Sequence, residues 1–522
     1  MRKEAADVIV VGGSLGGCIA AMSVAKMGFS VILTEETDWI GGQLTSQAVP
    51  PDEHPWIEEF GCTATYRTFR NRVRDYYKLN YPLTEKAMKD ELLNPGNGWV
   101  SRLSHEPKVA LQVLEDMLAP YVNSGKVRIL LNHTPIHASA SENIIKSVAI
   151  RDNATGEQVE LNGTYYLDAT ECGDILPLAG VDYVMGAEAQ KETGEPHAPI
   201  HANAKDTQAI TYVFAVDYIK GGNFVIDKPE QYDFWKDYIP SYSKWPLLSW
   251  YAVNSLDTST MKKFTLFPNE QDIAALFTYR RVLDTEQLTD SVYEGDISLI
   301  NWPQNDYFLG SIIDVTEEER EKHLKSAKQL SLSLLYWLQT EAPRLDGGKG
   351  YPELRLRKDV LGTEDGLAKY PYIRESRRIK ALYTVTEADV SKDLREDIRT
   401  YPDSVGVGSY HLDLHHTTVS NRTFYIPAHP YEIPLGALIP LHVKNLLPAC
   451  KNIGTTQITN SCYRLHPTEW NIGESVGYLA AYAIAKRIEP KEVRENPKHL
   501  HAYQQLLMEK GIELHWPEGM EI

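Results

Sequence analysis

Apolar and polar positions in the first 36 residues follow the pattern of a strand, a turn, a helix and a second strand. The run "DVIVVGG" at 7–13 is continuous and β-branched, which is typical of a central parallel strand. Residues 15–28 predict a helix with small side chains on its packed face, closed by Gly28. The run "SVILTEE" predicts a second strand that ends at Glu35. We therefore expect an α/β fold built on a parallel sheet.

The next periodic segments continue this pattern as far as residue 170. Residues 106–125 predict a helix, and the run 127–136 ("VRILLNHTPI") predicts one strand. Residues 141–170 predict a strand, a turn at "NATG", another strand and a last strand that ends at Asp168.

The character of the chain changes at about residue 186. A polar, turn-rich stretch is followed by residues 219–310, which are dense in Tyr, Trp and Pro. Thr316 and Glu319 form a capping box that predicts a helix reaching about Thr340.

Composition and charge exclude several classes of protein. The chain has 522 residues and a net charge of −18, which argues against binding nucleic acid or anionic membranes. No run of about 18 apolar residues is present, so we expect no membrane span. The five cysteines contain no C-x-x-C pair, which argues against a disulfide framework or an iron–sulfur cluster. We expect a cytoplasmic protein, although a chain from which a leader peptide had been removed would look the same.

The turn "GGSLGG" at residues 12–17 is the first motif with chemical content. The dinucleotide fingerprint is G-x-G-x-x-G, and here its three positions are Gly12, Ser14 and Gly17. The motif follows a strand, opens a helix and precedes an acid, Glu35, 23 residues after Gly12. The helix N-terminus would bind a pyrophosphate, and Glu35 would accept hydrogen bonds from a ribose. The alternative is a purely structural glycine-rich turn.

The residues after Glu35 favour FAD over NAD. Gly41 and Gly42 follow soon after this acid, and "QLTSQ" comes next, where an NAD-binding unit would go directly into another helix. This arrangement resembles the extended FAD-binding mode of the glutathione-reductase-like superfamily. "YYLDATECGD" at 165–174 resembles its second signature. "NSCYRLHPTEWNIGESVG" at 460–477 resembles its C-terminal signature, in which a helix N-terminus faces the flavin pyrimidine.

Longer motifs resemble one family within this superfamily. "WIGGQLTSQAVPPDEHPWIEEFGCTATYRTFR", "INWPQNDY", "YIRESRRI" and "NLLPACKNIGTTQITNSCYRLHPTEWNIGESVG" look like the FAD-dependent oxidoreductase family whose members are often misannotated as xanthan lyase. The resemblance covers about residues 5–487 and implies a flavoprotein without naming a substrate. Ser14 departs from the middle glycine of the fingerprint. The cofactor-binding residues that the resemblance implies are Gly12, Gly13, Ser14, Gly16, Gly17, Glu35, Glu36, Gly41, Gly42, Gln43, Thr45, Pro135 or Ile136, Ala169, Thr170, Asn471, Ile472 and Gly473.

The resemblance also implies a division of the chain. We expect a Rossmann-like FAD-binding domain of the glutathione-reductase type, made of residues 1–185 and 421–490. An α+β substrate or cap domain is expected to be inserted at 186–420, and residues 491–522 to form a C-terminal helix and tail.

Two residues just before the C-terminal signature helix are candidates for catalysis. Oxidation by hydride transfer needs a group that removes or delivers a proton, and His466 is such a group. Alternatively, His466 and Pro467 only shape the loop. Arg464 is expected to hold an anionic group or the flavin O2 region.

Two further segments carry candidate substrate-binding side chains. In "GSYHLDLHHT", His411, Asp413 and His415 share one face of a predicted strand, which could line a site, bind a metal loosely or face solvent. In "RESRR", Arg377 is expected to point away from Arg374, and either could clamp a carboxylate or pair with the protein's own acids. We assign no metal.

The aromatic segments bear on the substrate. "INWPQNDY" offers Trp302, Asn305, Asp306 and Tyr307, which suit a sugar-like polyol or equally the packing of a core. A redox disulfide would need Cys172 and Cys450 to meet, which the sequence alone cannot establish.

Together these features predict an enzyme that passes hydride between a small polar substrate, for example one derived from a carbohydrate, and FAD. The alternative is an electron-relay or binding subunit of a larger complex. A third hypothesis, a polysaccharide lyase, follows only from the frequent misannotation of the family. The N-terminal dinucleotide-binding unit makes this activity improbable. The sequence leaves open the substrate, the direction, the electron acceptor, covalent attachment of the flavin and whether the chain forms a homo-oligomer.

Overall fold

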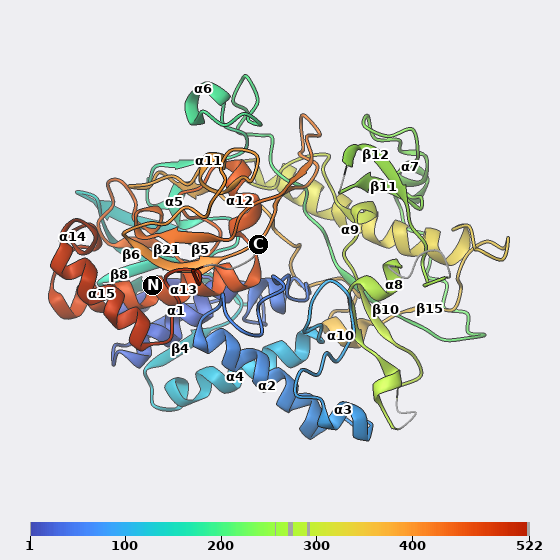
Figure 1. The fold of residues 1–522 in the computed structure, drawn as a ribbon, viewed down its shortest axis with the longest axis horizontal. Helices are drawn as coiled ribbons and strands as arrows, with labels where there is room; N and C mark the ends of the chain where they lie inside the picture. The colour runs from blue at the N-terminus through green and yellow to red at the C-terminus, as the bar shows by residue number, and fades with distance from the viewer. Residues whose placement is uncertain (1, 256, 270–274, 290–292, 519–522) are drawn as a thin grey trace.

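A computed structural model describes residues 2–255, 257–269, 275–289 and 293–518 of the chain. Its central element is a five-stranded parallel sheet, on the left in Figure 1. The strands, in spatial order, are β21 (Leu446–Pro448), β8 (Tyr165–Asp168), β2 (Val8–Val11), β3 (Val31–Thr34) and β4 (Val127–Leu130). The strand–helix–strand unit predicted from the first 36 residues is confirmed.

One face of this sheet carries α1 (Leu15–Lys26) and α13 (His466–Lys486). The two helices touch through glycine: a Cβ built on Gly473 would lie 2.1 Å from the carbonyl oxygen of Gly16. This contact explains the small residues predicted on the packed face of α1. The helix α4 (Pro107–Asn123) also contacts α1 and confirms the helix predicted at 106–125.

The other face is covered by a four-stranded sheet with the order β1-β7-β6-β5. Its strands are β1 (Arg2–Ala5), β7 (Gln158–Asn162), β6 (Ile144–Asp152) and β5 (His133–Ser141). The single strand predicted at 127–136 is wrong, because it is divided between β4 and β5. Asn132 between them has φ +60°, a left-handed conformation that ends one strand and redirects the chain into the other sheet.

The right half in Figure 1 has its own sheet and its own hydrophobic core. The sheet has the order β13-β14-β10-β15, with β13 (Arg281–Leu283), β14 (Ile297–Ile300), β10 (Phe214–Tyr218) and β15 (Leu354–Leu356). The long helix α9 (Glu317–Thr340) packs here, and its predicted capping box at Thr316 is confirmed. A hairpin of β11 (Tyr251–Asn254) and β12 (Asp257–Lys263) lies beside it.

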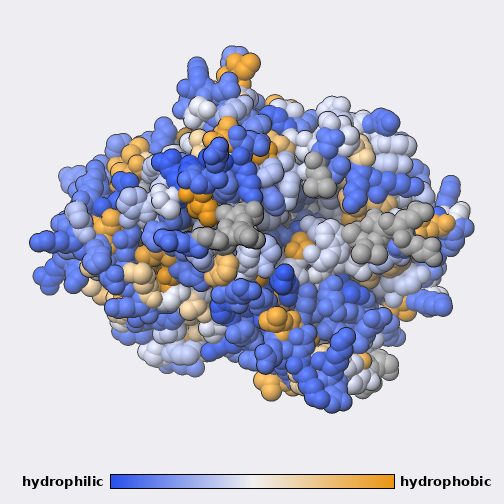
Figure 2. Space-filling model, viewed as in Figure 1, coloured by the Kyte–Doolittle hydropathy of each residue, from blue (hydrophilic) through white to orange (hydrophobic). Residues whose placement is uncertain are grey.

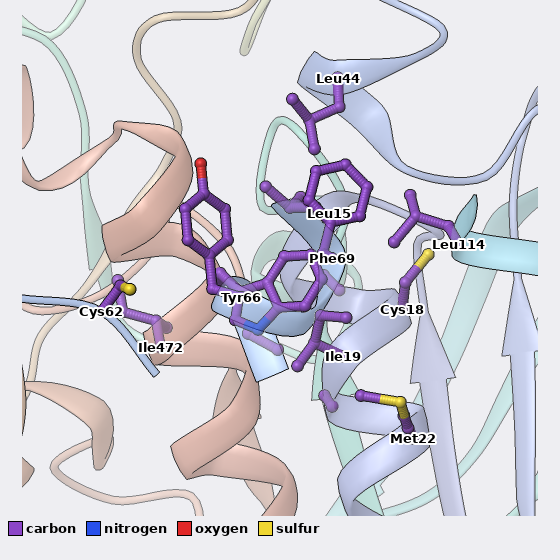
Figure 3. Close-up of a cluster of buried hydrophobic side chains, with 14 of the residues drawn as sticks. Leu15, Cys18, Ile19, Met22, Leu44, Cys62, Tyr66, Phe69, Leu114 and Ile472 are labelled. Carbon is purple, nitrogen blue, oxygen red and sulfur yellow. The ribbon is translucent and has the colours of Figure 1, made fainter. Parts of the chain in front are cut away.

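The helix α2 (Ala64–Asn80) has no counterpart among the elements expected from sequence. Its Tyr66 and Phe69 pack between α1 and α13, where they meet Ile19 and Ile472 (Figure 3). Arg70 on its buried side pairs with Glu53 at 2.9 Å and with Glu58, so this helix is tied to the loop before it.

The remaining elements are short, apart from α15. They are η1 (Gly42–Leu44), α3 (Glu85–Lys89), α5 (Ile175–Leu178), β9 (Tyr183–Val184), α6 (Gln190–Thr193), α7 (Tyr232–Asp237), α8 (Leu276–Tyr279), η2 (Thr285–Gln287), η3 (Pro303–Asn305), α10 (Lys358–Leu361), β16 (Arg378–Ile379), α11 (Glu387–Val390), β17 (Ser404–Gly408), β18 (Leu412–Leu414), β19 (Phe424–Ile426), β20 (Tyr431–Pro434), η4 (Leu435–Leu438), α12 (Gln457–Tyr463), α14 (Pro490–Glu495) and α15 (Pro497–Glu509).

Hydrophilic residues cover most of the face seen in Figure 2, and apolar residues appear there in small separate groups. None of the described helices combines the length and the apolar character needed to cross a lipid bilayer.

Candidate active site

The turn between β2 and α1 is built so that only glycine fits at its critical positions. Gly12 has φ +103°, and a Cβ there would lie 2.3 Å from the backbone of Ala169 at the end of β8. A Cβ on Gly17 would lie 2.2 Å from the carbonyl oxygen of Gly12. Ser14 is the N-cap of α1, and its hydroxyl accepts a hydrogen bond from the Gly17 N–H. The fingerprint therefore closes strand, turn and helix against one another.

A pocket opens over this turn and brings together segments that are distant in the chain. Six of the predicted cofactor residues line it: Gly12, Ser14, Glu35, Glu36, Gly42 and Ala169. Pro135 and Thr170, which the resemblance also implied, line it as well. Thr34, Ser46, His133, Glu171, Asp174 and Tyr370 complete the lining without having been predicted.

Glu35 lies at the end of β3 and faces the glycine turn. Its carboxylate accepts hydrogen bonds from the Gly13 N–H at 3.0 Å and from the N–H and hydroxyl of Thr37 at 2.9 and 2.7 Å. Burial raises the pKa of Glu35 to about 7, although the Thr37 and Gly13 donors oppose this rise. The carboxylate is therefore held at the position where the sequence predicts a ribose.

Replacing Glu35 with glutamine is expected to flatten the pH dependence of stability in the FAD-free protein. The folded state keeps the Glu35 proton up to about pH 7, whereas the unfolded chain releases it near its ordinary pKa of about 4.3. Between these values the folded state binds more protons, so stability falls as pH rises by up to about 1.4 kcal/mol per pH unit. Urea unfolding at several pH values measures this slope. An unchanged slope in Glu35→Gln, or the same flattening in the exposed control Glu157→Gln, would contradict the assignment.

A buried group of charges lies at the N-terminus of α1. Glu469 accepts a hydrogen bond from the Gly16 N–H at 3.1 Å, and Gln43 donates to the other oxygen of the same carboxylate. The Lys451 ammonium bonds Glu171 and lies 3.5 Å from Glu469. Because free N–H groups at a helix N-terminus are where dinucleotide phosphates bind, a pyrophosphate would share this helix end with Glu469.

The same group resembles a metal site in its donor atoms. Those of Glu171, Cys450 and Glu469 lie within 4.8 Å of one another. The ammonium of Lys451 already pairs with both carboxylates, so it supplies the positive charge that a metal ion would bring. The five cysteines are free and buried, and no disulfide joins Cys172 to Cys450.

Other predicted cofactor residues lie outside the pocket lining. The Thr45 hydroxyl donates to the Ile40 carbonyl at 2.6 Å and shapes the loop, and Ile136 is not among the lining residues. Asn471 donates to the Val405 carbonyl at 3.3 Å, while Ile472 packs in the core. Gly473 meets Gly16, so it positions α13 against α1.

The start of α13 explains this placement. The sequence predicts that His466 and Pro467 precede the helix, but α13 begins at His466. Pro467 fits the first turn because its missing N–H would have no partner there anyway. Asn471 to Gly473 therefore lie in the second turn. The first turn contacts Gln43, a predicted cofactor residue, which donates to Glu469 and, just before the helix, to the Arg464 carbonyl at 3.1 Å.

Both ring nitrogens of His466 bind the backbone of one loop. Nδ1 accepts from the Asp52 N–H at 3.0 Å, which leaves the proton on Nε2 to donate to the Val49 carbonyl at 3.2 Å. Burial, reinforced by the charge of Arg280, holds the pKa of His466 well below its usual range. The structure therefore places His466 as a neutral side chain that fixes residues 49–52.

Replacing His466 with alanine is expected to lower the free energy of unfolding by about 2–4 kcal/mol, because two hydrogen bonds are lost and a cavity remains. FAD retention should fall with it, since the loop at 49–52 loses its anchor. Chemical unfolding and the ratio of flavin to protein after gel filtration measure both. If His466 acted only as a catalytic base, His466→Ala would instead have normal stability and normal flavin content, and only its turnover would be slower.

A second polar cluster surrounds His415, just after β18. Its Nδ1 lies 2.6 Å from an oxygen of Asp306, and its Nε2 lies 3.3 Å from an oxygen of Asp413. Asp306 also pairs with Arg374 at 2.9 Å. Burial alone would raise the pKa of both aspartates. The charge of Arg374 beside Asp306 and that of protonated His415 beside Asp413 outweigh the effect of burial. They hold the pKa of Asp413 at about 2 and that of Asp306 lower still, so both remain charged.

The cluster opens into a small cavity of about 120 Å³. His415, with a side chain 26% exposed, lines this cavity together with Asp306, Asp413 and the aromatic rings of Trp245 and Tyr425. Asp413 and His415 meet, as their predicted shared face requires. His411 is not among the lining residues.

Arg464 joins the His415 cluster to the cofactor side. Its guanidinium donates to the Tyr372 hydroxyl at 2.7 Å and lies 3.5 Å from Asp413, while its carbonyl accepts from Gln43. Its buried Nε has no hydrogen-bond partner among the described residues. Arg280 is similar: it lies 3.5 Å from Asp52, and its Nε is buried without a partner.

Arg377 lies outside this cluster. It donates to the Cys172 carbonyl and pairs with Asp174 and Asp314 at 2.9 and 2.7 Å. These partners fit the alternative of pairing with the protein's own acids. Arg374 is the arginine that reaches the His415 cluster, so the two arginines point to different places as predicted, although the strand begins only at Arg378.

Four charged residues at the site were missed at the level of sequence: Glu171, Arg280, Lys451 and Glu469. Glu171, Lys451 and Glu469 lie inside motifs quoted above, yet no spacing rule connects them. Only the approach of β8, β21 and α13 brings Glu171, Lys451 and Glu469 together.

Comparison with known proteins decides the family. Residues 7–507 match the family described as FAD dependent oxidoreductase. The chain belongs to this family. It is therefore an FAD-dependent enzyme, and the turn, the pocket and Glu35 have the donor and acceptor groups that this cofactor requires.

Solved structures are similar at low identity. A geranylgeranyl bacteriochlorophyll reductase-like protein from Thermoplasma acidophilum has 12% identity and a TM-score of 0.33, covering 98% of this chain and 85% of that one. The anhydrotetracycline hydroxylase OxyS from Streptomyces rimosus has 11% identity and a TM-score of 0.32, covering 97% and 70%. L-proline dehydrogenase from P. horikoshii has 14% identity and a TM-score of 0.17, and the match covers 36% of this chain and only 24% of that one. No curated protein matches. None of these likenesses identifies the substrate of this oxidoreductase.

Proposed function

We propose that this oxidoreductase oxidises a hydroxyl-bearing carbon of a small polar substrate. The observation that carries the proposal is the position of His415 between two ionised aspartates, at a cavity that Arg464 links to the cofactor side. Bound FAD supplies the two-electron acceptor for the hydride that leaves the carbon. The step requires the neutral ring of His415: the hydroxyl proton passes to its unprotonated Nε2, and the C–O single bond becomes a carbonyl.

The two aspartates suit His415 to this task. Asp306 accepts from Nδ1 at 2.6 Å, which orients the ring and leaves Nε2 as the basic nitrogen. Asp413 stabilises the imidazolium that forms when Nε2 takes the proton, since its carboxylate is 3.3 Å away. Arg374 holds Asp306 in place from the other side.

Two loose ion pairs support a hydroxylated substrate. Arg464 and Asp413 are 3.5 Å apart, as are Arg280 and Asp52, which is longer than a charge-assisted hydrogen bond. Each arginine also has a buried N–H without a partner. A substrate hydroxyl can accept from such an arginine and donate to its aspartate at the same time, so polyols fit this arrangement.

We also propose that residues 186–420 supply the substrate side and that 1–185 with 421–490 supply the cofactor side. The support is the second hydrophobic core, whose buried members all lie between Cys172 and Ile373. A cytoplasmic location remains a prediction from the sequence.

The test is the visible spectrum of the purified protein, followed by anaerobic titration with sugars, glycosides and small hydroxy acids. We expect a flavin band that one class of hydroxylated compound bleaches. A flavin that no compound bleaches, but that a protein or quinone partner reduces or oxidises, would favour the electron-relay alternative.

A further inference from the structure

A second cavity, of about 390 Å³, adjoins the one at His415. Trp245 and Tyr251 line both cavities, and their rings stack with centroids 4.1 Å apart and planes within 3° of each other. The second cavity lies among the β11–β12 hairpin, the C-terminal end of α9 and residues 343–351 (right half of Figure 1). Its size falls in the range of about 300–1,000 Å³ that small-molecule sites occupy.

The walls of this cavity are aromatic. Trp250 and Trp337 meet edge to face at 5.2 Å, and Tyr351 closes another side with the Arg344 guanidinium 4.7 Å from its ring centre. The negative faces of aromatic rings attract C–H groups, so such walls suit the C–H faces of a pyranose ring.

The charged residues at the rim of the cavity determine which sign of charge a ligand should carry. Among the residues that the structure describes, Lys263, Arg344 and Lys349 line the cavity together with one acid, Glu341. Glu341 is already paired with Lys236 at 2.6 Å. Arg344 is paired with Asp346 and Glu353, and the charge of Lys349 also acts on Glu341. Neither Lys263 nor Lys349 lies within ion-pair distance of an acid among the described residues, in a chain with a net charge of −18. A local excess of unpaired cations in an acidic protein favours an anionic ligand.

We propose that the second cavity binds a carboxylated sugar ring, of the uronic acid type, that is linked to the ring oxidised at His415. This inference rests on the proposed function and narrows its substrate class to acidic disaccharides or longer acidic saccharides. The stacked rings of Trp245 and Tyr251 would support the linkage between the two units, while Lys263 and Lys349 bind the carboxylate.

The test compares two disaccharides that differ in one group. Cellobiose and β-glucuronosyl-(1→4)-glucose share their linkage, and only the second carries a carboxylate. Their dissociation constants with the FAD-loaded protein are measured by tryptophan fluorescence, which needs no turnover. We expect the acidic disaccharide to bind about tenfold to a hundredfold more tightly, with the preference falling as salt increases.

The matched variants are Lys263→Gln with Lys349→Gln, and Lys322→Gln as a control on the exposed part of α9. The double variant should lose the preference for the acidic disaccharide and keep its affinity for cellobiose, whereas the control should behave as the wild type. Equal affinities for the two disaccharides in the wild type, no binding of either, or a preference that survives the double variant would overturn the proposal.

The two proposals fail in different ways. Lysine-dependent binding of the acidic disaccharide without bleaching of the flavin would retain this subsite and reject oxidation at His415. Bleaching by sugars, combined with equal affinities of the wild type for cellobiose and for the acidic disaccharide, would retain the oxidation and reject the subsite.

Discussion

Replacing Gly12 with alanine is expected to abolish FAD binding. The methyl group would lie 2.3 Å from the backbone carbonyl of Ala169 and 2.4 Å from the amide nitrogen of Thr170, and neither can move without separating β2 from β8. The φ angle of +103° adds further strain to any residue with a side chain. Since the turn is the floor of the cofactor pocket, its displacement removes the surface on which the cofactor lies.

The measurement is titration of FAD into the cofactor-free variant, followed by flavin fluorescence, with thermal unfolding recorded alongside. Gly28→Ala is the matched control, because Gly28 has a similar φ of +91° but no atom within 4 Å of the added methyl. We expect the control to bind FAD normally with a small loss of stability. If the two variants bound FAD equally well, the contact between position 12 and Ala169 would have no effect on FAD binding. The positive φ would then be the only reason for a glycine at position 12.

A milder variant keeps the prediction testable if Gly12→Ala does not fold. Gly13→Ala has an ordinary φ, and its methyl would meet the side chain of Glu35 at 2.8 Å. The nearest atom is the Cβ of Glu35, so β3 must shift slightly, but this overlap is smaller than the 2.3 Å contacts at Gly12, and we expect a folded protein with weakened FAD binding. Normal FAD affinity in this variant would show that the position of Glu35 does not matter for binding the cofactor.

Replacing His415 with glutamine is expected to slow flavin reduction by substrate roughly 10²–10⁴-fold, the usual contribution of a general base. Glutamine keeps a hydrogen bond donor for Asp306 but cannot take the substrate proton. FAD content and the flavin spectrum should not change, because His415 lines the cavity at Asp413 and not the cofactor pocket.

Anaerobic stopped-flow mixing with the substrate found by titration measures this rate. His442→Gln is the control, since His442 has a side chain 63% exposed and lies outside both cavities that Trp245 lines. A normal rate of flavin reduction in His415→Gln would remove His415 from the proposed mechanism. A loss of bound FAD would show that the residue acts on the structure and not on the chemistry.

Local pattern was sufficient to predict the first unit of the fold, and the family resemblance supplied further residues that line the pocket over its turn. The β2–α1–β3 segment is specified by β-branched runs, a glycine turn and an acid at a fixed distance, all of which act over short stretches of chain. Gly12, Ser14 and Glu35 belong to this pattern, whereas Gly42 and Ala169 follow from the family resemblance, and all five line one pocket. These contacts follow the order of the chain or the standard pairing of parallel strands.

What the sequence could not predict depends on the approach of distant segments. Asn132 divides one apolar run between two sheets, because a single left-handed residue outweighs the local strand pattern. His466 has the residue type of a base, but the loop at 49–52 occupies both its nitrogens. His415 acquires its two aspartates only when residues 306 and 413–415 meet across the fold. Charge and exposure at a site are set by such neighbours, and neighbours of this kind are decided by tertiary packing.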